Sequence, residues 1–372
     1  DVDPPAGGTA MIPYGRQSID EDDIAAVIDV LRTDWLTQGP TVEEFEADLA
    51  SLTGARHAVA YANGTAALHG ACFAAELGPG DRLLTSSLSF AASANCGRYV
   101  GADVGFVDIE AKTLNMNPAA VPSGVDALVP VHFAGLPLDL NRLANRPRVI
   151  IEDAAHAIGA ATPDGPVGNC AHSEMTAFSF HPVKTITTGE GGAVTTNDDR
   201  LADRLRKFRH HGITRLPERG GWYYEIDELG LNYRLTDIQA ALGRSQLRKL
   251  GSYIKRRHEL AERYDLLLAD LPVEVAPSAP PGSTHGHHLY PVRVGNRDEV
   301  FAYMREHGVG VQVHYVPIHL QPAYAGVESR HLLETTEAYA HLVSLPLFPD
   351  LTDDEQDIVV ATLAQALEHT GS

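Results

Sequence analysis

Between about residues 55 and 200, short runs of β-branched and other apolar residues alternate with stretches whose apolar residues recur at helical spacing. This alternation is typical of an α/β fold, in which a mainly parallel sheet is covered by helices. Several runs are apolar on both faces, as expected for strands between two helix layers. The seven predicted strands are His57–Asn63, Arg82–Ser87, Val104–Ile109, Ala127–Phe133, Val149–Asp153, Met175–Phe180 and Gly192–Thr196.

Helices predicted from the apolar spacing flank these strands. Asp20 is expected to cap the first of them, because a side-chain oxygen at that position accepts hydrogen bonds from the first helical turn. The predicted helices are Asp20–Arg32, Val42–Leu52, Thr65–Ala75, Leu201–Arg209, Thr236–Leu250 and Ile254–Leu268.

A proline-rich stretch from Pro272 to Pro281 marks the clearest change in composition. We therefore expect a flexible N-terminal segment over residues 1–12, a large domain over 13–250 and a small C-terminal α/β domain over 251–372. The elements predicted after the break are strand His288–Val294, helix Asp298–His307, strand Gly310–Val316 and helix Asp353–Leu367.

The composition is that of an ordinary folded protein, with 44% hydrophobic and 21% charged residues among 372. Its 29 basic and 49 acidic residues give a formal net charge of −20. This charge argues against nucleic-acid and anionic-membrane partners, because proteins that bind them need a basic face. An anionic substrate would need cations gathered at its binding site.

No apolar run approaches the roughly 18 residues of a membrane span, and the first residues show neither the basic nor the apolar region of a signal peptide. Cys72, Cys96 and Cys170 are widely spaced, which indicates buried free thiols in a reducing compartment. We therefore expect a cytoplasmic protein.

The lysines point to one position with chemical potential. The chain has five lysines against 24 arginines, and Lys207, Lys249 and Lys255 lie among arginines on predicted helices. Lys112 lies in a polar turn. Lys184 has no arginine or lysine near it and is surrounded by apolar and hydroxyl residues. A lysine that acts as a nucleophile is therefore sought at position 184.

An acid is expected at the edge of the sheet. The apolar strand from Val149 runs directly into Glu152 and Asp153, which places at least one carboxylate where open α/β folds bind ligands. A buried carboxylate needs a cation or several hydrogen-bond donors, and a pyridinium nitrogen would satisfy Asp153. The simpler alternative is that Asp153 caps a following helix.

Gly64 and Thr65 end one predicted strand and open a helix, where backbone N–H groups and a hydroxyl can bind an anion. The glycines of Gly189–Gly192 fit a loop that packs around a ligand, although a plain β-turn has the same composition. Pyridoxal phosphate needs a phosphate site, an acid at its ring nitrogen and a lysine that forms a Schiff base. The chain offers all three, with Ser179 close to Lys184.

The segments NGTAALH, EDAAHAIGA, FSFHPVKTITTGEGGAVTTND, GLNYRLTDIQAALG and VQVHYVPIHLQPAY resemble the DegT/StrS family of pyridoxal-phosphate sugar aminotransferases over about residues 11 to 368. Through IPYGRQSID, DWLTQGP and HYVP, the chain is most similar to the PseC type. That type aminates the C4 keto group of a UDP-linked 2-acetamido-2,6-dideoxy sugar on the route to pseudaminic acid.

The resemblance implies a fold type I aminotransferase that works as a homodimer with active sites shared between subunits. It implies L-glutamate as amino donor and a nucleotide-linked 4-keto-6-deoxy sugar as acceptor. Lys184 then matches the covalent lysine, and Asp153 matches the acid at the pyridinium nitrogen. The further cofactor residues implied are Gly64, Thr65, Phe90, His156, Ser179 and, lent by the neighbouring subunit, Asn232. The substrate residues implied are Tyr14, Trp35, Thr37, Asn63, Ser89, Arg234, His314, Tyr315, Val316 and Pro317.

Other functions remain open from the sequence. A 3-keto sugar or an aminocyclitol ketone could be the acceptor. A sugar 3-dehydratase of the same family would carry histidine in place of Lys184, and a non-catalytic cofactor-binding regulator would need a DNA-binding segment that is not visible. No metal site is predicted, because the spacing of His285, His287 and His288 fits no standard zinc pattern and instead indicates a solvated loop.

Overall fold

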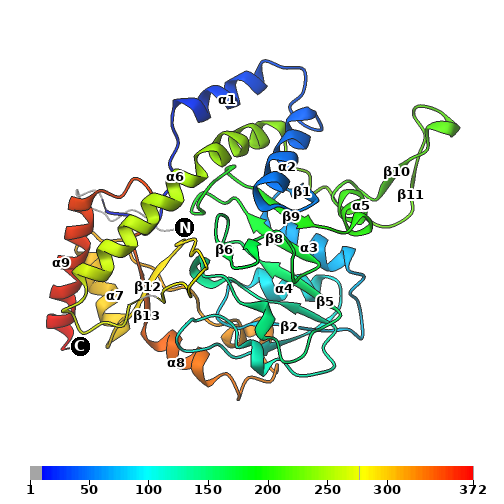
Figure 1. The fold of residues 1–372 in the computed structure, drawn as a ribbon. Helices are drawn as coiled ribbons and strands as arrows, with labels where there is room; N and C mark the ends of the chain where they lie inside the picture. Colours follow the sequence, from blue (N-terminus) through cyan, green and yellow to red (C-terminus); the bar gives the residue numbers. More distant parts are fainter. Residues whose placement is uncertain (1–10, 276, 372) are drawn as a thin grey trace.

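The computed structural model describes residues 11–275 and 277–371. Its centre is a seven-stranded sheet with strand order β1-β9-β8-β5-β4-β2-β3 (Figure 1). Strands β8, β5, β4, β2 and β3 pair in parallel, whereas β9 is antiparallel to both β8 and β1. The strands are β1 His57–Tyr61, β2 Arg82–Ser86, β3 Asp103–Val107, β4 Ala127–Val129, β5 Val149–Asp153, β8 Met175–Ser179 and β9 Gly192–Thr196.

The predicted α/β fold with a mainly parallel seven-stranded sheet is confirmed. Strands β5 and β9 have the predicted bounds, and the other strands end earlier than predicted. The residues just beyond the strand ends, among them Asn63 and Val131, line a cavity at the carboxyl edge of the sheet. These positions therefore belong to the cavity at the sheet edge rather than to continued strand pairing.

Helices cover both faces of the sheet, as predicted. Along β1, Val59 and Tyr61 pack with α3 and α5, whereas Ala58 and Ala60 pack with α2 and α6 on the opposite face. This alternation follows from the period of two along a strand. The helices before residue 210 are α1 Glu21–Leu31, α2 Pro40–Thr53, α3 Gly64–Ala74, α4 Ala92–Tyr99 and α5 Asp199–Phe208.

The two helices predicted over 236–250 and 254–268 are wrong, because they form one helix, α6 Asp237–Leu267. Gly251 does not interrupt the helix, since an interior glycine costs only about 1 kcal/mol relative to alanine. Leu250 packs in a cluster on the sheet, whereas Leu260 packs in a second apolar cluster built largely by the C-terminal part. Helix α6 thus joins the two clusters, and the domain boundary at residue 250 stays a prediction.

The C-terminal part is a smaller α/β unit around the antiparallel pair β12 and β13. The predicted strand Gly310–Val316 is wrong. Within it, Gln312 makes an isolated bridge to Ser344, and the chain then leaves the sheet toward the cavity. Pro317, which has no N–H to donate, follows directly. The elements are β12 Tyr290–Arg293, α7 Arg297–Glu306, α8 Leu333–His341, β13 Leu342–Leu345 and α9 Asp353–Thr370.

The N-terminal prediction lies largely outside the described residues, which begin at residue 11. Ile12, at the end of the predicted flexible segment, is buried and bridges to Val309 of the C-terminal unit. Among helices of the described residues, none has the length and apolarity needed to cross a membrane. The three cysteines are buried free thiols, as predicted.

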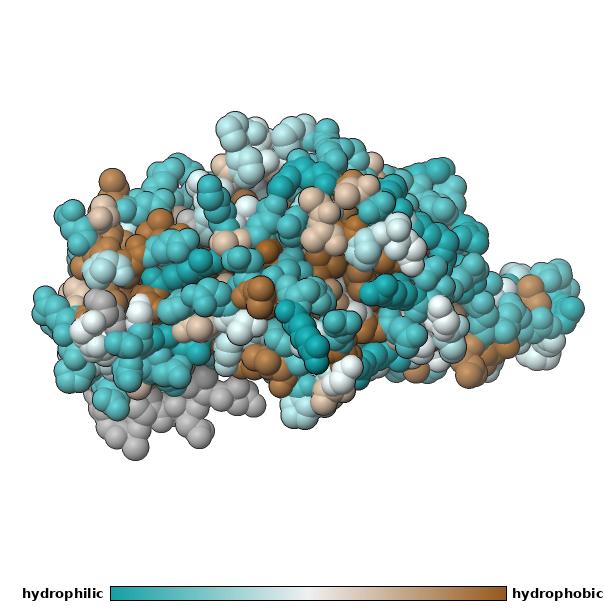
Figure 2. All heavy atoms as spheres, turned by 90° about the horizontal axis from the view of Figure 1, so that it is seen from below, coloured by the Kyte–Doolittle hydropathy of each residue, from teal (hydrophilic) through white to brown (hydrophobic). Residues whose placement is uncertain are grey.

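A two-stranded hairpin, β10 Ile213–Arg215 and β11 Tyr224–Ile226, projects from the body (Figure 1). In the second view it extends sideways from the rest of the molecule and carries apolar side chains (Figure 2). Trp222 is 79% exposed, and Leu229 beyond the hairpin is 87% exposed. A small hairpin of β6 Ala161–Thr162 and β7 Gly165–Pro166 lies beside the sheet.

Two glycine-to-alanine substitutions in α6 should have opposite effects on stability. A methyl group at Gly243 would lie 2.7 Å from the Phe45 ring, whereas one at Gly251 meets nothing within 4 Å. We expect Gly243→Ala to lower the free energy of unfolding by about 1–3 kcal/mol through overpacking. Gly251→Ala should raise it by about 0.5–1 kcal/mol through helix propensity. Urea unfolding measures both, and equal effects would contradict the close packing of α6 on α2.

Candidate active site

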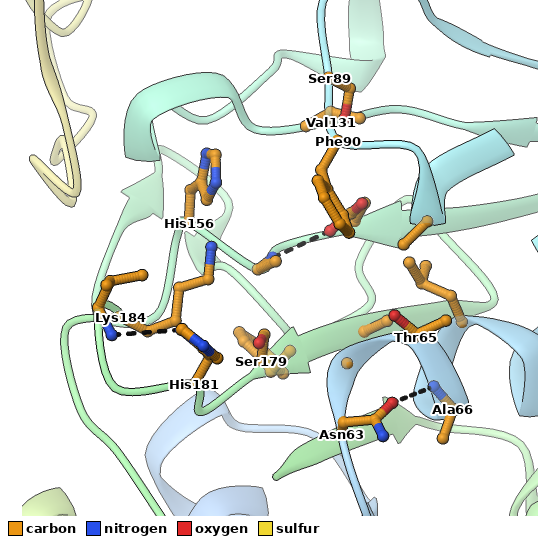
Figure 3. A pocket seen from close by; sticks show the side chains of 18 of the residues that line it. Asn63, Thr65, Ala66, Ser89, Phe90, Val131, His156, Ser179, His181 and Lys184 are labelled. Carbon is orange, nitrogen blue, oxygen red and sulfur yellow. Dashed lines mark hydrogen bonds between the residues drawn. The ribbon is translucent and has the colours of Figure 1, made fainter. Parts of the chain in front are cut away.

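A cavity of about 610 Å³ opens at the carboxyl edge of the sheet. Residues at or beyond the ends of β1, β2, β4, β5 and β8 line it, which is where open α/β sheets bind ligands. In Figure 3, Lys184 and His156 lie on one side of the cavity, and Asn63 and Thr65 lie at the start of α3 on the other. The C-terminal unit contributes His288, His314 and Tyr315.

Most of the predicted site residues lie together in this cavity. It brings residues from five strand ends and from the C-terminal unit next to one lysine. The predicted residues that line it are Tyr14, Asn63, Gly64, Thr65, Ser89, Phe90, Asp153, His156, Ser179, Lys184, His314 and Tyr315. Their individual roles stay predictions.

Trp35, Thr37 and Asn232 are not among the residues that line this cavity. Trp35 is 55% exposed, and Thr37 makes a bridge to the backbone of Thr236. Asn232 is exposed and bridges to His210. In a single chain, these three predicted site residues therefore do not contribute to the wall of the main cavity.

Arg234 lines a second pocket of about 350 Å³, together with Arg215 and His210. Its Nη1 lies 2.9 Å from His210 Nδ1. Val316 is exposed and lines a shallow pocket next to the main cavity, and Pro317 is buried beside it. Val316 and Pro317 follow Tyr315, which lines the main cavity, just as Asn232 and Arg234 flank Tyr233, which also lines it.

Asp153 is the acid that faces the cavity. It is 5% exposed, and its carboxylate accepts hydrogen bonds from Ser93 Oγ at 2.6 Å and from the amide of Ala155 at 3.1 Å. The segment that follows forms turns rather than a helix, so the alternative that Asp153 caps a helix is wrong. Ser93 on α4 was not predicted, because nothing in the sequence links it to a strand-end acid.

The preceding acid, Glu152, has a structural role. Burial alone would raise the pKa of Glu152, but hydrogen bonds from His132, Ser173 and Thr176 lower it below its ordinary value. Nε2 of His132 lies 2.8 Å from Oε2 of Glu152. Because neighbouring strand residues point to opposite faces, the two adjacent acids serve different surroundings.

Lys184 lies in the loop after β8 and is partly buried. Burial lowers the pKa of its amine to about 8, while the negative charge of Asp153 acts in the opposite direction. Its Nζ lies 3.5 Å from Nε2 of His288. A substantial fraction of the amine is therefore neutral, and so nucleophilic, close to physiological pH.

The start of α3 lies opposite Lys184 and has backbone amides suited to an anion. Asn63 Oδ1 caps the amide of Ala66 at 2.8 Å, and the amides of Gly64 and Thr65 precede it at the same helix end. A Cβ at Gly64 would lie 2.8 Å from Cβ of Ser179, so glycine is required for this approach. The Thr65 and Ser179 side chains complete the lining there.

Three buried histidines surround the lysine. Burial lowers the pKa values of His156, His288 and His314, and the charge of Lys184 lowers them further. His156 Nε2 lies 2.9 Å from the Tyr315 hydroxyl. Among the described residues, Nδ1 of His156 is buried and without a hydrogen-bond partner. An unpaired buried nitrogen at a cavity wall indicates that a polar ligand completes the site.

The prediction of a solvated loop at His285, His287 and His288 is wrong. His285 is 2% exposed and His288 is 4% exposed. The loop is buried because Arg257, itself 1% exposed, donates from Nη1 to the carbonyl oxygens of His287, His288 and Leu347 at 3.0, 3.3 and 3.0 Å. Among the described residues, no group of three or more His, Cys, Asp or Glu side chains is placed to hold a metal ion.

These groups fit pyridoxal phosphate by their chemistry. Asp153 can hold a protonated ring nitrogen, and the start of α3 with Ser179 can hold a phosphate. Lys184 supplies the amine for a carbonyl, and Phe90, 60% exposed at the cavity, offers an aromatic face. The unpaired Nδ1 of His156 provides a further polar group for the ligand.

Comparison with known proteins identifies a family. The model described as the DegT/DnrJ/EryC1/StrS aminotransferase family matches residues 17–364. Among curated proteins, the spore coat polysaccharide biosynthesis protein SpsC of Bacillus subtilis is 36% identical over 373 aligned positions, covering 94% of this chain and 95% of SpsC.

Solved structures show the same fold. The PLP form of Spr1654 from Streptococcus pneumoniae has a TM-score of 0.89 at 29% identity, covering 96% of this chain and 99% of that one. Helicobacter pylori PseC, an aminotransferase involved in the biosynthesis of pseudoaminic acid, has a TM-score of 0.88 at 27% identity, covering 96% and 100%. PseC is therefore one of several similar structures, and the prediction that the chain is most similar to the PseC type is not supported at that level of detail.

The reactivity of Lys184 in the full chain freed of cofactor should rise with pH to a midpoint near pH 8, because burial lowers its pKa to about 8. Only the neutral amine reacts with an acylating reagent, so labelling should increase about tenfold per pH unit below the midpoint and then level off. Pulse labelling followed by mass spectrometry of the Lys184 peptide measures this. Lys255, whose side chain is 80% exposed, is the control in the same digest. Labelling of Lys184 that still rises steeply above about pH 10 would contradict its burial.

Proposed function

The chain belongs to the DegT/DnrJ/EryC1/StrS aminotransferase family, whose members use pyridoxal phosphate, and on that premise we propose that it moves the amino group of L-glutamate to a keto sugar carried by a nucleotide. The acceptor proposed first is UDP-2-acetamido-2,6-dideoxy-4-hexulose, aminated at C4. A 3-keto sugar or an aminocyclitol ketone is the second candidate.

One observation carries the proposal: Lys184 and Asp153 line the same cavity as the start of helix α3, whose amides are suited to an anion. Asp153 would hold the ring N–H, and Gly64, Thr65 and Ser179 would hold the phosphate. When bound, pyridoxal phosphate supplies an electron-withdrawing ring that stabilises negative charge on the carbon next to the transferred nitrogen.

The chain itself supplies the proton transfer. With a pKa of about 8, the Lys184 amine can both take and return a proton near neutral pH. Ser93 and the amide of Ala155 donate to the Asp153 carboxylate and hold it in position beside the proposed ring site. The His156 side chain, joined to the Tyr315 hydroxyl, forms the wall next to these groups and limits the entry of water.

Two relatives support a sugar substrate. SpsC is named as a polysaccharide biosynthesis protein, and PseC as an enzyme of pseudoaminic acid biosynthesis. A nucleotide diphosphate would have to enter a chain of net charge −20, so local cations are required. Arg215 and Arg234, which both line the second pocket, are the cations proposed for this purpose.

We propose further that two copies of the chain share their active sites. Asn232, Trp35 and Arg234 lie outside the cavity of their own chain. The hairpin just before Asn232 projects from the body and exposes Trp222, an arrangement suited to contact with a second copy (Figure 1). A shared site would bring the outlying residues to the cavity of the neighbour.

The proposed reaction is tested with glutamate and a panel of UDP-, dTDP- and GDP-linked keto sugars, read by the mass of the aminated product. Lys184→Ala should abolish turnover and still bind the cofactor, because the phosphate and ring-nitrogen sites remain. Lys255→Ala, at an exposed lysine, is the matched control and should keep full activity. Full activity of Lys184→Ala, or no amination of any sugar or cyclitol ketone, would refute the proposal, and release of ammonia would favour a dehydratase.

Mixing two inactive variants tests the shared site. Lys184→Ala and Asn232→Ala should each lose activity, but their heterodimer contains one site with both residues intact. Random co-assembly should restore about a quarter of the wild-type sites. Lys184→Ala with Asp153→Ala is the control, since both residues line the cavity of the same chain and no rescue is expected. Absence of rescue in the first mixture would place Asn232 outside the neighbouring site.

A further inference from the structure

His288 belongs to the C-terminal unit, yet it reaches the reactive lysine of the sheet. Its Nε2 lies 3.5 Å from Nζ of Lys184, although the two residues are 104 positions apart. Its ring centroid lies 4.4 Å from that of His156. Neither the reaction described above nor the sequence motifs give His288 a role.

The backbone around His288 is held from two sides. The amide of His288 donates to the carbonyl of Ala134 at 2.8 Å, and the amide of Gly286 donates to that of Gly135 at 2.8 Å. From the other side, the buried guanidinium of Arg257 donates to the carbonyl oxygens of His287 and His288. Burying a cation whose hydrogen bonds go to carbonyl oxygens and not to a carboxylate costs free energy. Burial accordingly lowers the pKa of Arg257 to about 10. The loop position is therefore strongly specified.

The His288 ring is free to change tautomer. In His132, by contrast, both ring nitrogens have partners. Its Nδ1 accepts from the amide of Leu138 at 3.0 Å and its Nε2 lies 2.8 Å from Glu152, which fixes the tautomer. Among the described residues, Nδ1 of His288 is buried without a partner. No second contact thus forces Nε2 to be only a donor or only an acceptor.

We propose that His288 is a positioning residue for Lys184, accepting a hydrogen bond from the charged amine and donating one to the neutral amine. Its ring would keep Nζ aimed along one direction in both protonation states, as a group that takes and returns a proton requires. This inference rests on the role of Lys184 in the proposed function.

The charged surroundings of Lys184 make the effect measurable. Its amine also faces Asp153 on β5 and the rings of His156, His181 and His314. The pKa values of these three rings lie below the ordinary value, chiefly through burial of His156 and His314, whereas the His181 side chain is exposed. Asp153 is the anion that favours the ammonium form. A hydrogen bond from the ammonium is stronger than one between the neutral ring and the neutral amine, so His288 favours the ammonium form. Its removal should therefore make Lys184 lose its proton more easily.

The test compares His288→Leu with His288→Gln, which keeps an acceptor oxygen. In the chain freed of cofactor, acylation of Lys184 should reach its midpoint about 0.5–1 pH unit lower in His288→Leu and close to wild type in His288→Gln. In the holoenzyme, the pH profile of kcat should move in the same direction, with kcat about tenfold to a hundredfold lower in His288→Leu. Binding of glutamate, read as KM, should change little.

His287→Asn is the control on the same loop, because His287 adopts a left-handed conformation that asparagine tolerates and it does not line the cavity. An unchanged Lys184 midpoint in His288→Leu, or an equal shift in His287→Asn, would overturn the proposal. His288 would then serve only the structure of the loop. Because the labelling needs no substrate, a failure to aminate keto sugars alongside the expected labelling shift would refute the proposed function and not this inference.

Discussion

A primary amine acts as a nucleophile only without its proton, and a lysine reaches that state near neutral pH only where burial disfavours its charge. The site depends on this balance at Lys184. Burial lowers the pKa of the amine to about 8, and the carboxylate of Asp153 opposes a larger change. Both groups must lie at one sheet edge, which the parallel strands β5 and β8 ensure by ending side by side.

Close backbone contacts bring the anion site to the same place. Gly64 allows the start of α3 to lie against Ser179, and Gly192 allows β9 to lie against the backbone of Asn63, where a Cβ would be 2.5 Å away. Because β9 runs antiparallel between β1 and β8, its glycine end meets the carboxyl ends of both neighbours. Gly64 and Gly192, which have no side chains, thus allow the start of α3 and the end of β8 before the Lys184 loop to lie close together.

The C-terminal unit closes the other side of the cavity. His314, Tyr315 and His288 come from segments that leave the small sheet, and the buried Arg257 on α6 fixes the last of them. Helix α6 packs on both apolar clusters. Together with the hydrogen bonds from the amides of Gly286 and His288 to Gly135 and Ala134, it holds the C-terminal unit against the sheet part.

Local sequence patterns were enough to predict much of the fold and many of the residues that line the cavity. Strand periodicity predicted the seven strands, and the isolation of Lys184 from other cations, together with the strand-end acids, predicted the chemistry of the cavity. The chain order alone could not tell which of Glu152 and Asp153 faces the ligand, nor that Ser93 donates to Asp153. The residue patterns between 236 and 268 also suggested two helices, because a glycine weakens a helical signal whether or not tertiary packing tolerates it.

By itself, then, the sequence determined the α/β class and singled out Lys184 and the acids at the end of β5, because periodicity, strand ends and residue type are properties of neighbouring positions. Only the tertiary structure decided that His288 is buried beside Lys184 and that Asn232 and Arg234 do not line the main cavity of their own chain. It also decided that Arg257 donates hydrogen bonds to the loop around His287. These facts rest on contacts between residues far apart in the chain, and no local pattern records the burial or the hydrogen bonds that such contacts create.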